Sequence, residues 1–296
     1  MSVHSWTEAT FAASDGYPLS YRRYPATGLA RAEVVCLHGI QSHAGWYEHS
    51  CQRLALAGFD VFFLDRRGSG RNQPARGDAP SFRRLLDDVA EFLRSKRPLD
   101  AQAKLPYLLG ISWGAKLAVG LQRRQPSLTA GLVLLCPGFC PQARTPLFRR
   151  LAIAASRLPA PRRPFPIPLN DPELFTATPR WLEFLRTDPL ALHHATARFL
   201  IESLRLDLYV RWAASAVRVP TLLMLAGQDR IINNQRTRRL IGWFSGPVEV
   251  IEYPEAHHTL EFEPDPECFL GDLLAWLNRQ TALTRGQESG VSIPDS

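Results

Sequence analysis

The chain has 296 residues, of which 45% are hydrophobic and 21% are charged. This composition is typical of a globular protein with a substantial core and excludes a disordered chain. The formal net charge is +7, but the arginines are scattered along the whole chain and form no basic stripe interleaved with aromatic residues. The sequence therefore does not indicate nucleic-acid binding.

Two features of the sequence bear on the cellular compartment of the protein, namely its N-terminal segment and its cysteines. The segment from Met1 to Ser20 lacks the basic start and apolar stretch of a signal peptide. No apolar run approaches the roughly 18 residues that a membrane span needs. The five cysteines cannot all pair within the chain, and Cys36 and Cys136 lie in apolar runs, so we expect both to be small buried hydrophobes. Free thiols favour a cytoplasmic location.

Short apolar runs alternate with longer amphipathic stretches along most of the chain. The runs are apolar for several consecutive residues, which is the pattern of strands buried on both faces. They cover residues 33–37, 59–64, 105–109, 131–135, 221–225 and 248–253. The amphipathic stretches between them cover 46–57, 81–96, 113–124, 233–243 and 265–281. This alternation predicts an α/β fold, a mostly parallel sheet with helices on both faces.

Two segments depart from this alternation. Residues 9–12 and 19–24 flank a turn-rich sequence, which predicts antiparallel strands at the start of the sheet. Between residues 137 and 219 the chain is rich in proline and shows helical patterns at 146–158, 179–186 and 195–214. We therefore predict an α/β core at 1–138 and 219–284, an inserted helical cap at 139–218, and a disordered tail at 285–296.

A candidate nucleophile lies between a predicted strand and a predicted helix. Gly110-Ile111-Ser112-Trp113-Gly114 follows the run 105–109 and precedes the stretch 113–124. This is the G-x-S-x-G elbow in the strand–turn–helix setting that it requires. Small residues are needed there because the serine sits on a tight, strained turn. The sequence predicts that Ser112 is a nucleophile at a helix N-terminus, where negative charge is favoured.

A serine nucleophile needs a histidine to take its proton and a carboxylate to orient that histidine. Asp229 ends a glycine turn after the run 221–225, so it should lie at the same sheet edge as Ser112. Asp207 falls in a helical stretch and Asp265 lies beyond the histidines. Asp229 is therefore the predicted acid.

The predicted base follows the last strand. His257 and His258 come directly after the run 248–253, at the carboxyl end of that strand. Both are therefore expected at the sheet edge that carries Ser112. Spacing alone does not distinguish the two histidines.

The loop after the first core strand reads His38-Gly39-Ile40-Gln41-Ser42-His43. Its glycine allows the backbone to approach a ligand, so we predict that the amides of Ile40 and Trp113 form an oxyanion hole. His38 is expected to be a buried structural hydrogen-bonding group. We do not expect a metal site at His38, His43 and His49, because their spacing matches no metal-ligand motif.

One helix of the predicted cap has an apolar face. The residues of this face recur at three- and four-residue intervals, and they are Leu147, Phe148, Leu151, Ala154, Ala155 and Leu158. The ordinary interpretation is that the face packs onto the core. The alternative is a lid that makes weak peripheral contact with a lipid surface and binds anionic headgroups.

Several motifs together resemble a known family. They are the segment 38–47, Asp65-Arg66-Arg67-Gly68-Ser69-Gly70, the serine elbow, Ala226-Gly227-Gln228-Asp229 and Glu255-Ala256-His257-His258. The chain resembles the monoacylglycerol lipase and lysophospholipase branch of the α/β-hydrolases, which is of the serine aminopeptidase S33 type, from about residue 15 to residue 277.

The resemblance implies the α/β-hydrolase fold, with Ser112 as nucleophile, Asp229 as acid and His258 as base. It also implies a serine esterase or lipase that acts through an acyl-enzyme under a mobile cap, without a cofactor or metal. The segment 65–70 is then a structural turn. Trp113 departs from the family pattern, in which a smaller or more flexible residue follows the serine, and could crowd the acyl pocket.

The leading functional hypothesis is hydrolysis of a monoacylglycerol, lysophospholipid or similar hydrophobic ester. Two alternatives stay open. The same acyl-enzyme could pass its acyl group to an alcohol or thiol, or the chain could be a non-catalytic binding protein with a hydrolase fold. The presence of all three triad residues disfavours the last of these.

Overall fold

The computed structural model of the chain describes residues 6–96, 104–142 and 145–289. Its central sheet is built from β1 (Thr7–Ala12), β2 (Pro18–Tyr24), β3 (Ala32–Leu37), β4 (Phe59–Leu64), β5 (Tyr107–Ile111), β6 (Gly131–Leu135), β9 (Thr221–Ala226) and β10 (Val248–Tyr253). The strand order is β1-β2-β4-β3-β5-β6-β9-β10. β1 pairs antiparallel with β2 and β2 pairs antiparallel with β4, whereas all other pairs are parallel. The predicted sheet, including its antiparallel start, is confirmed.

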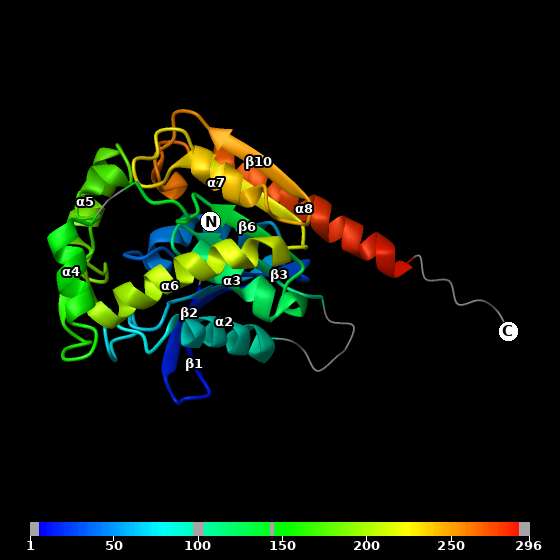
Figure 1. Cartoon of the computed structure of the whole chain (residues 1–296). Coiled ribbons are helices and arrows are strands. Elements are labelled where there is room, and N and C mark those ends of the chain that lie inside the picture. Colours follow the sequence, from blue (N-terminus) through cyan, green and yellow to red (C-terminus); the bar gives the residue numbers. More distant parts are fainter. Residues whose placement is uncertain (1–5, 97–103, 143–144, 290–296) are drawn as a thin grey trace.

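Helices cover both faces of this sheet (Figure 1). They include α1 (Glu48–Leu56), α2 (Phe82–Lys96), α3 (Gly114–Arg124), α7 (Asn234–Ile241) and α8 (Glu267–Ser289). Apolar side chains of α2, α3 and α7 form a core on one face, and those of α1 and α8 form a second core on the other. Burial of these two apolar layers against the sheet is the main stabilising contribution to the fold.

The last strand departs from the sequence-based expectation. The run 248–253 was expected to be buried on both faces, but in β10 Glu249, Val250 and Glu252 are exposed. β10 lies at the edge of the sheet and pairs only with β9. Glu249 and Glu252 form ion pairs with Arg279 and Arg238 on neighbouring helices. Charged side chains on an edge strand also oppose pairing with another chain.

The segment between β6 and β9 holds three helices and a small hairpin. The helices are α4 (Leu147–Ala155), α5 (Pro179–Thr187) and α6 (Ala197–Ala213), and β7 (Pro164–Pro166) pairs antiparallel with β8 (His194–Thr196). In Figure 1, α4 and α5 lie at the end of the molecule away from the C-terminal end of α8, whereas α6 runs back along α3. Leu206 and Val210 of α6 are buried in the same core as α3. Only the part of the segment before α6 therefore lies beyond the sheet.

The apolar face of α4 does not pack onto the core, so the ordinary interpretation of this helix is wrong. No residue of α4 is buried. The exposed fraction is 69% for Leu147, 70% for Phe148, 62% for Leu151 and 87% for Leu158 just beyond the helix. Helical periodicity shows that a face is apolar but not what covers it, and the helix that α4 contacts is α6.

The C-terminal helix is longer than the sequence suggested. α8 continues to Ser289, five residues into the segment 285–296 that was predicted to be disordered. Residues 290–296 lie outside the described residues. Neither α8 nor any other helix in the described part of the chain has the length and apolarity needed to cross a membrane.

Candidate active site

Ser112 lies on the turn between β5 and α3, in a strained backbone conformation. Its φ is 50°, in the left-handed region that a non-glycine residue rarely adopts. The turn is fixed on both sides, because the amide of Ser112 donates to the carbonyl of Leu135 at 2.9 Å and its carbonyl accepts from the amide of Gly138 at 2.8 Å. The conformation directs the hydroxyl out of the sheet edge, at the N-terminus of α3.

The glycines of the elbow are required by close backbone contacts. A Cβ atom on Gly114 would lie 2.3 Å from the carbonyl oxygen of Leu37, and one on Gly110 would lie 2.6 Å from the Cα atom of Ala115. Both distances are far below van der Waals contact, and both obstacles are backbone atoms. The predicted need for small residues in this turn is therefore confirmed.

The structure brings Ser112, His258 and Asp229 together from three separate loops. Nε2 of His258 lies 2.9 Å from Oγ of Ser112, and Nδ1 lies 2.7 Å from Oδ2 of Asp229. Because a carboxylate only accepts hydrogen bonds, Nδ1 carries the proton and Nε2 is free to accept one from the serine. The other carboxylate oxygen of Asp229 accepts from the amides of Ile231 at 2.8 Å and Ile232 at 2.9 Å. His258 and Asp229 are both buried.

His257 points to a different partner. Its amide and its Nδ1 both contact the carboxylate of Glu263, at 2.8 and 3.1 Å. Of the two adjacent histidines, which spacing alone did not distinguish, only His258 reaches Ser112. The ring of Phe175 packs edge-on against His258, with 6.0 Å between the ring centroids. Phe175 belongs to the segment before α5, and no motif in the sequence marked it.

The loop after β3 lies beside the serine. A Cβ atom on Gly39 would be 3.4 Å from Cβ of Ser112, which places the Gly39–Ile40 peptide next to the hydroxyl. The carbonyl of Gly39 accepts a hydrogen bond from Nδ1 of His38 at 2.7 Å, so the amide of Ile40 in the same peptide unit points the opposite way. Within the described residues, the amides of Ile40 and Trp113 donate to no protein acceptor. Both remain available to a ligand.

His38 is a buried hydrogen-bonding group, as predicted. Its Nε2 accepts from the amide of Arg66 at 2.9 Å, while Nδ1 donates to Gly39. Burial, and secondarily the charge of Arg66, hold the pKa of His38 well below its ordinary value. His38 is therefore neutral, with its proton on Nδ1.

The turn 65–70 has a structural role. The carboxylate of Asp65 is buried and accepts from the amides of Ala44 at 2.8 Å and Arg71 at 2.9 Å. Gly70 has a φ of 55°, and a Cβ atom there would lie 2.3 Å from the Asp65 carboxylate. Only glycine fits this position. Asp65 thus joins the loop after β4 to the start of the helical segment after β3.

The other histidines of the 38–49 segment contact carboxylates in separate places. Nε2 of His43 lies 3.0 Å from Asp188, and Nε2 of His49 lies 2.9 Å from Glu267. Asp188 also accepts from Nε1 of Trp46 at 2.6 Å. No motif in the sequence indicated this contact, because Asp188 and its partners are far apart in the chain.

One group of metal-ligand residue types occurs among the described residues. The ligand atoms of Cys136, Asp229 and His258 lie within 4.8 Å of one another, and all three residues are buried. Burial and the charge of Asp229 raise the pKa of the Cys136 thiol well above its ordinary value. A metal needs the thiolate, so this environment disfavours metal binding. Cys136 instead behaves as the buried hydrophobe that the sequence predicted, as does Cys36.

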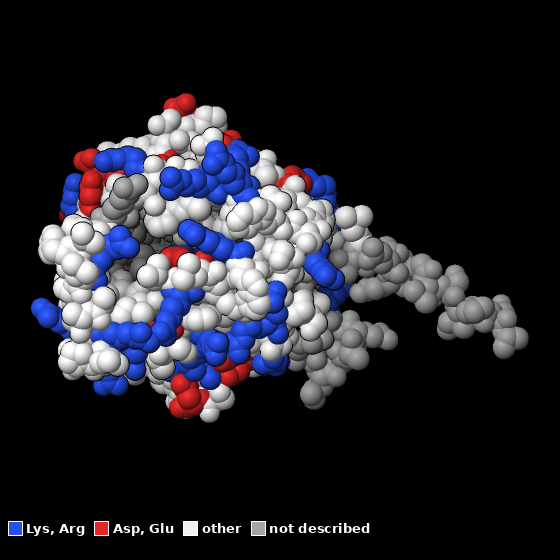
Figure 2. Space-filling view, in the orientation of Figure 1, with Lys and Arg blue, Asp and Glu red and all other residues white. Residues whose placement is uncertain are grey.

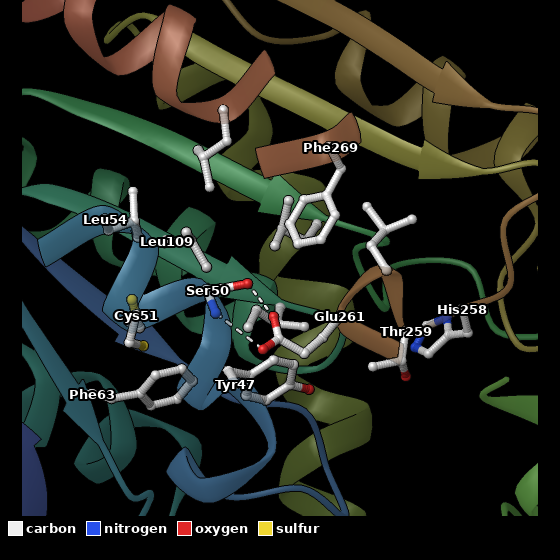
Figure 3. A pocket seen from close by; sticks show the side chains of 15 residues that line it. Tyr47, Ser50, Cys51, Leu54, Phe63, Leu109, His258, Thr259, Glu261 and Phe269 are labelled. Carbon is white, nitrogen blue, oxygen red and sulfur yellow. Dashed lines mark hydrogen bonds between the residues drawn. The ribbon is translucent and has the colours of Figure 1, made fainter. Parts of the chain in front are cut away.

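Two hollows lie near the site. Figure 2 shows that the surface is hollowed between α4, α5 and the start of α6, with Lys and Arg side chains around the hollow. Figure 3 shows an internal apolar cavity between His258, α1 and α8, with Glu261 at its polar side. The internal cavity measures about 20 Å³, enough for about one water molecule. It is too small for an acyl chain.

Comparison with known proteins places this geometry in a family. The sequence matches the family described as serine aminopeptidase, S33, over residues 28–265. It is 28% identical to a monoacylglycerol lipase of Mycolicibacterium smegmatis, over 92% of this chain and 96% of that protein. It is 27% identical to lysophospholipase L2 of Escherichia coli, over 87% of this chain and 83% of that protein.

Solved structures show the same fold. The monoacylglycerol lipase of Paleococcus ferrophilus superposes with a TM-score of 0.79 at 22% identity, over 88% of this chain and 99% of that one. A soluble variant of the monoglyceride lipase of Saccharomyces cerevisiae superposes with a TM-score of 0.81 at 18% identity, over 95% of this chain and 96% of that one. Sequence and fold thus agree, and this chain belongs to the serine aminopeptidase S33 family of α/β-hydrolases.

Proposed function

We propose that this protein is a carboxylic ester hydrolase that cleaves esters of a hydrophobic acyl group through an acyl-enzyme on Ser112. The observation that carries the proposal is the position of His258, 2.9 Å from the Ser112 hydroxyl and 2.7 Å from Asp229. Relatives named monoacylglycerol lipase and lysophospholipase L2 indicate the substrate class. Monoacylglycerols and lysophospholipids are therefore the first substrates to test.

The proposed acylation step uses each of these groups. Oγ of Ser112 attacks the ester carbonyl while its proton passes to Nε2 of His258, and Asp229 stabilises the imidazolium that forms. The amides of Ile40 and Trp113 donate to the oxyanion of the tetrahedral intermediate. The intermediate collapses when the bond to the leaving alcohol breaks, and His258 returns its proton to that alcohol.

Deacylation repeats these steps with water as the nucleophile. Water attacks the acyl-enzyme carbonyl and gives a proton to Nε2 of His258. The same two amides stabilise the second oxyanion. Collapse of this intermediate breaks the bond to Oγ, His258 returns the proton to Ser112, and the carboxylic acid leaves. No group beyond the chain and water is needed.

The direct test compares the Ser112→Ala variant with the wild type on p-nitrophenyl butyrate and monoacylglycerols. We expect the variant to lose turnover and labelling by a fluorophosphonate, with an unchanged unfolding midpoint. Ser215→Ala, at an exposed serine far along the chain, serves as the control and should behave as wild type. Turnover or labelling that survives in Ser112→Ala would refute the assignment.

Acyl transfer is separated from hydrolysis by product analysis. The acyl-enzyme is common to both reactions, so the acceptor decides between them. Incubation with substrate and a competing alcohol yields free acid in a hydrolase and a new ester in an acyltransferase. We expect free acid to predominate at alcohol concentrations well below that of water. A binding protein without activity would give neither product and no fluorophosphonate adduct.

We further propose that α4 contacts the lipid surface from which such substrates come. Leu147, Phe148 and Leu151 are mostly exposed on this helix, and Arg150 is exposed beside them. An exposed apolar face flanked by basic residues suits an anionic lipid surface. The helix lies at the same end of the molecule as the hollow in Figure 2, so contact would bring this hollow close to the lipid surface.

Sedimentation with phosphatidylglycerol and phosphatidylcholine vesicles tests this contact. We expect more binding to the anionic vesicles, and less binding by a Phe148→Ser, Leu151→Ser double variant. Leu283→Ser on α8 is the matched control, because Leu283 is 62% exposed but lies away from α4. Equal, negligible binding of the wild type to both vesicles would exclude the contact.

A further inference from the structure

Arg66 contacts both residues of the proposed oxyanion hole. Its Nη2 donates to the carbonyl of Ile40 at 3.1 Å. Its guanidinium carbon lies 4.8 Å from the ring centroid of Trp113 and 4.9 Å from that of Phe199 on α6. Its amide donates to His38, whose other nitrogen holds the peptide that presents the Ile40 amide. Arg66, in the turn after β4, thus contacts the residues that form the proposed oxyanion hole.

The guanidinium of Arg66 is buried with few partners. Arg66 is only 6% exposed, and its Nε and Nη1 atoms have no hydrogen-bond partner among the described residues. A cavity of about 10 Å³ beside it, also lined by His38 and Arg67, is at the lower limit of the space for one water molecule. Most of the hydrogen-bonding capacity of a buried cation is therefore unused, which is costly.

The neighbouring Arg67 shows what a purely structural arginine looks like in this turn. Its guanidinium forms two hydrogen bonds to Asp88, at 2.7 and 2.8 Å, and a third to Asp15 at 2.9 Å. Arg66 has no such carboxylate. Burial lowers the pKa of Arg66 to about 9, and Asp65 opposes this shift, so the group stays charged at neutral pH. An apolar side chain would fill the same space without the desolvation cost.

We propose that Arg66 is a positioning residue that holds the oxyanion hole in its productive geometry through the Ile40 carbonyl and the Trp113 ring. The inference rests on the proposed esterase function. The Ile40 carbonyl and the Ile40 amide belong to successive peptide units, so a fixed carbonyl restricts the direction of the amide. The Trp113 ring contacts Arg66 and also donates from Nε1 to the hydroxyl of Ser203 at 2.8 Å.

The buried charge adds an electrostatic effect. In the transition state, the ester oxygen that accepts from the amides of Ile40 and Trp113 becomes negatively charged. The cation that supports these amides is Arg66, and no carboxylate of the described residues contacts its guanidinium. In a site from which water is excluded, such a fixed charge stabilises the oxyanion more than it would in water. Removal of Arg66 should therefore slow the chemical step and leave substrate binding largely unchanged.

The experiment measures kcat and KM of Arg66→Met on p-nitrophenyl butyrate, with active sites counted by fluorophosphonate titration. Methionine keeps an unbranched apolar stem in place of the arginine stem and removes the charge and the hydrogen bond. Loss of a direct oxyanion donor costs about 10²- to 10³-fold in kcat, so an indirect contact should cost about 10- to 100-fold, with KM within about 2-fold. Affinity for a trifluoromethyl ketone, which forms a tetrahedral oxyanion on the serine, should fall by the same factor as kcat.

Arg67→Met is the matched control for a loss of packing or stability. It should lower the free energy of unfolding at least as much as Arg66→Met, with kcat per titrated site close to wild type. If Arg66→Met keeps kcat and ketone affinity within 2-fold of wild type, or if Arg67→Met loses both equally, the proposal is overturned. Fluorophosphonate labelling of the wild type with loss of labelling in Ser112→Ala shows separately whether the esterase function stands.

Arg66→Lys keeps the proposal testable if the methionine variant does not fold. A buried ammonium loses its proton more readily than a guanidinium in the same place, so kcat of the variant should fall at a lower pH than kcat of the wild type, in which the pKa of Arg66 is about 9. The charged and titratable groups that act on this position are Asp65, Tyr17, Arg76 and His38. A kcat profile of Arg66→Lys that matches the wild type in both height and pH dependence would overturn the role of the charge.

Discussion

Nε2 of His43 and Oδ2 of Asp188 lie 3.0 Å apart, although 145 residues separate them in the chain. His43 ends the loop that presents the Ile40 amide, and Asp188 directly follows α5. Nδ1 of His43 accepts from the amide of Gly45 at 3.0 Å, so the proton is on Nε2 and faces the carboxylate. Oδ2 of Asp188 also accepts from Nε1 of Trp46, and Oδ1 accepts from the amide of Leu190. The Asp188 carboxylate therefore connects the segment after α5 to the loop after β3.

Asp188→Ala should lower the free energy of unfolding by about 2–4 kcal/mol, because it leaves two buried N–H donors, on His43 and Trp46, without an acceptor. Asp188→Asn should lose less, since its amide oxygen in the place of Oδ2 can still accept from both His43 and Trp46. Denaturant unfolding measures both. Asp171→Ala removes an exposed carboxylate before α5 that accepts from the amide of Glu173, and it should cost about 1 kcal/mol or less. An equal loss in Asp171→Ala and Asp188→Ala would contradict this account.

The adjacent histidines should differ sharply in their effect on activity. His258→Ala removes the group that accepts the Ser112 proton, so kcat on p-nitrophenyl butyrate should fall about 10⁴-fold or more. His257→Ala removes a contact to Glu263 only and should keep kcat within about 3-fold of wild type. Steady-state kinetics of the two variants, with circular dichroism to verify folding, decide between them. Comparable losses in both variants would leave the base unassigned.

Asp229→Asn should keep the fold and lose activity. The amide oxygen can replace Oδ1, which accepts from Ile231 and Ile232, and the NH₂ group then faces Nδ1 of His258. That donor favours the tautomer with its proton on Nε2, which cannot accept from Ser112, so kcat should fall about 10⁴-fold. Asp265→Asn, at the exposed acid beyond the histidines, should have wild-type kinetics. Full activity in Asp229→Asn would exclude Asp229 as the acid.

Local signals in the sequence predicted the sheet and the positions of Ser112, Asp229 and the histidine pair. The elbow requires a strand, a tight turn and a helix that are consecutive in the chain, so its conformation follows from adjacent residues. Asp229 follows β9 and His258 follows β10, and neighbouring parallel strands end at one sheet edge, so their convergence follows from topology. The choice of His258 over His257 came from the family resemblance, because spacing alone left both open.

The remaining features depend on contacts between distant segments. The exposure of α4 could not be predicted, because an apolar helical face has the same periodicity whether it meets a core or solvent. The exposure of β10 depends on its place at the sheet edge, which sequence order does not reveal. The contacts of Asp188 and of Arg66 each join segments that carry no shared motif. Position in the fold, rather than residue type, gives these side chains their roles.

A buried carboxyl group lies just beyond the proposed base. The carboxylate of Glu261 is almost fully buried and accepts hydrogen bonds from the amide and hydroxyl of Ser50 at the start of α1 (Figure 3). Burial raises the pKa of Glu261 to about 7, although the contacts with Ser50 favour the charged form. Thr259 follows His258 in the chain, and both residues line the same cavity as Glu261. The stability of the fold next to the site therefore depends on pH.

The raised pKa of Glu261 should make folding less favourable as pH rises. The folded protein holds this proton up to about pH 7, whereas the unfolded chain releases it near the ordinary value of 4.5. This contribution to stability is complete below about pH 4.5 and is lost as pH rises through 7. Glu261→Gln cannot titrate, so its free energy of unfolding relative to wild type should rise between pH 5 and pH 8.5, by at most about 3 kcal/mol. Denaturant unfolding at both values measures this difference, with Glu255→Gln, an exposed neighbour on the same loop, as the control. A Glu261→Gln difference that stays constant with pH would show that this carboxyl does not titrate in that range.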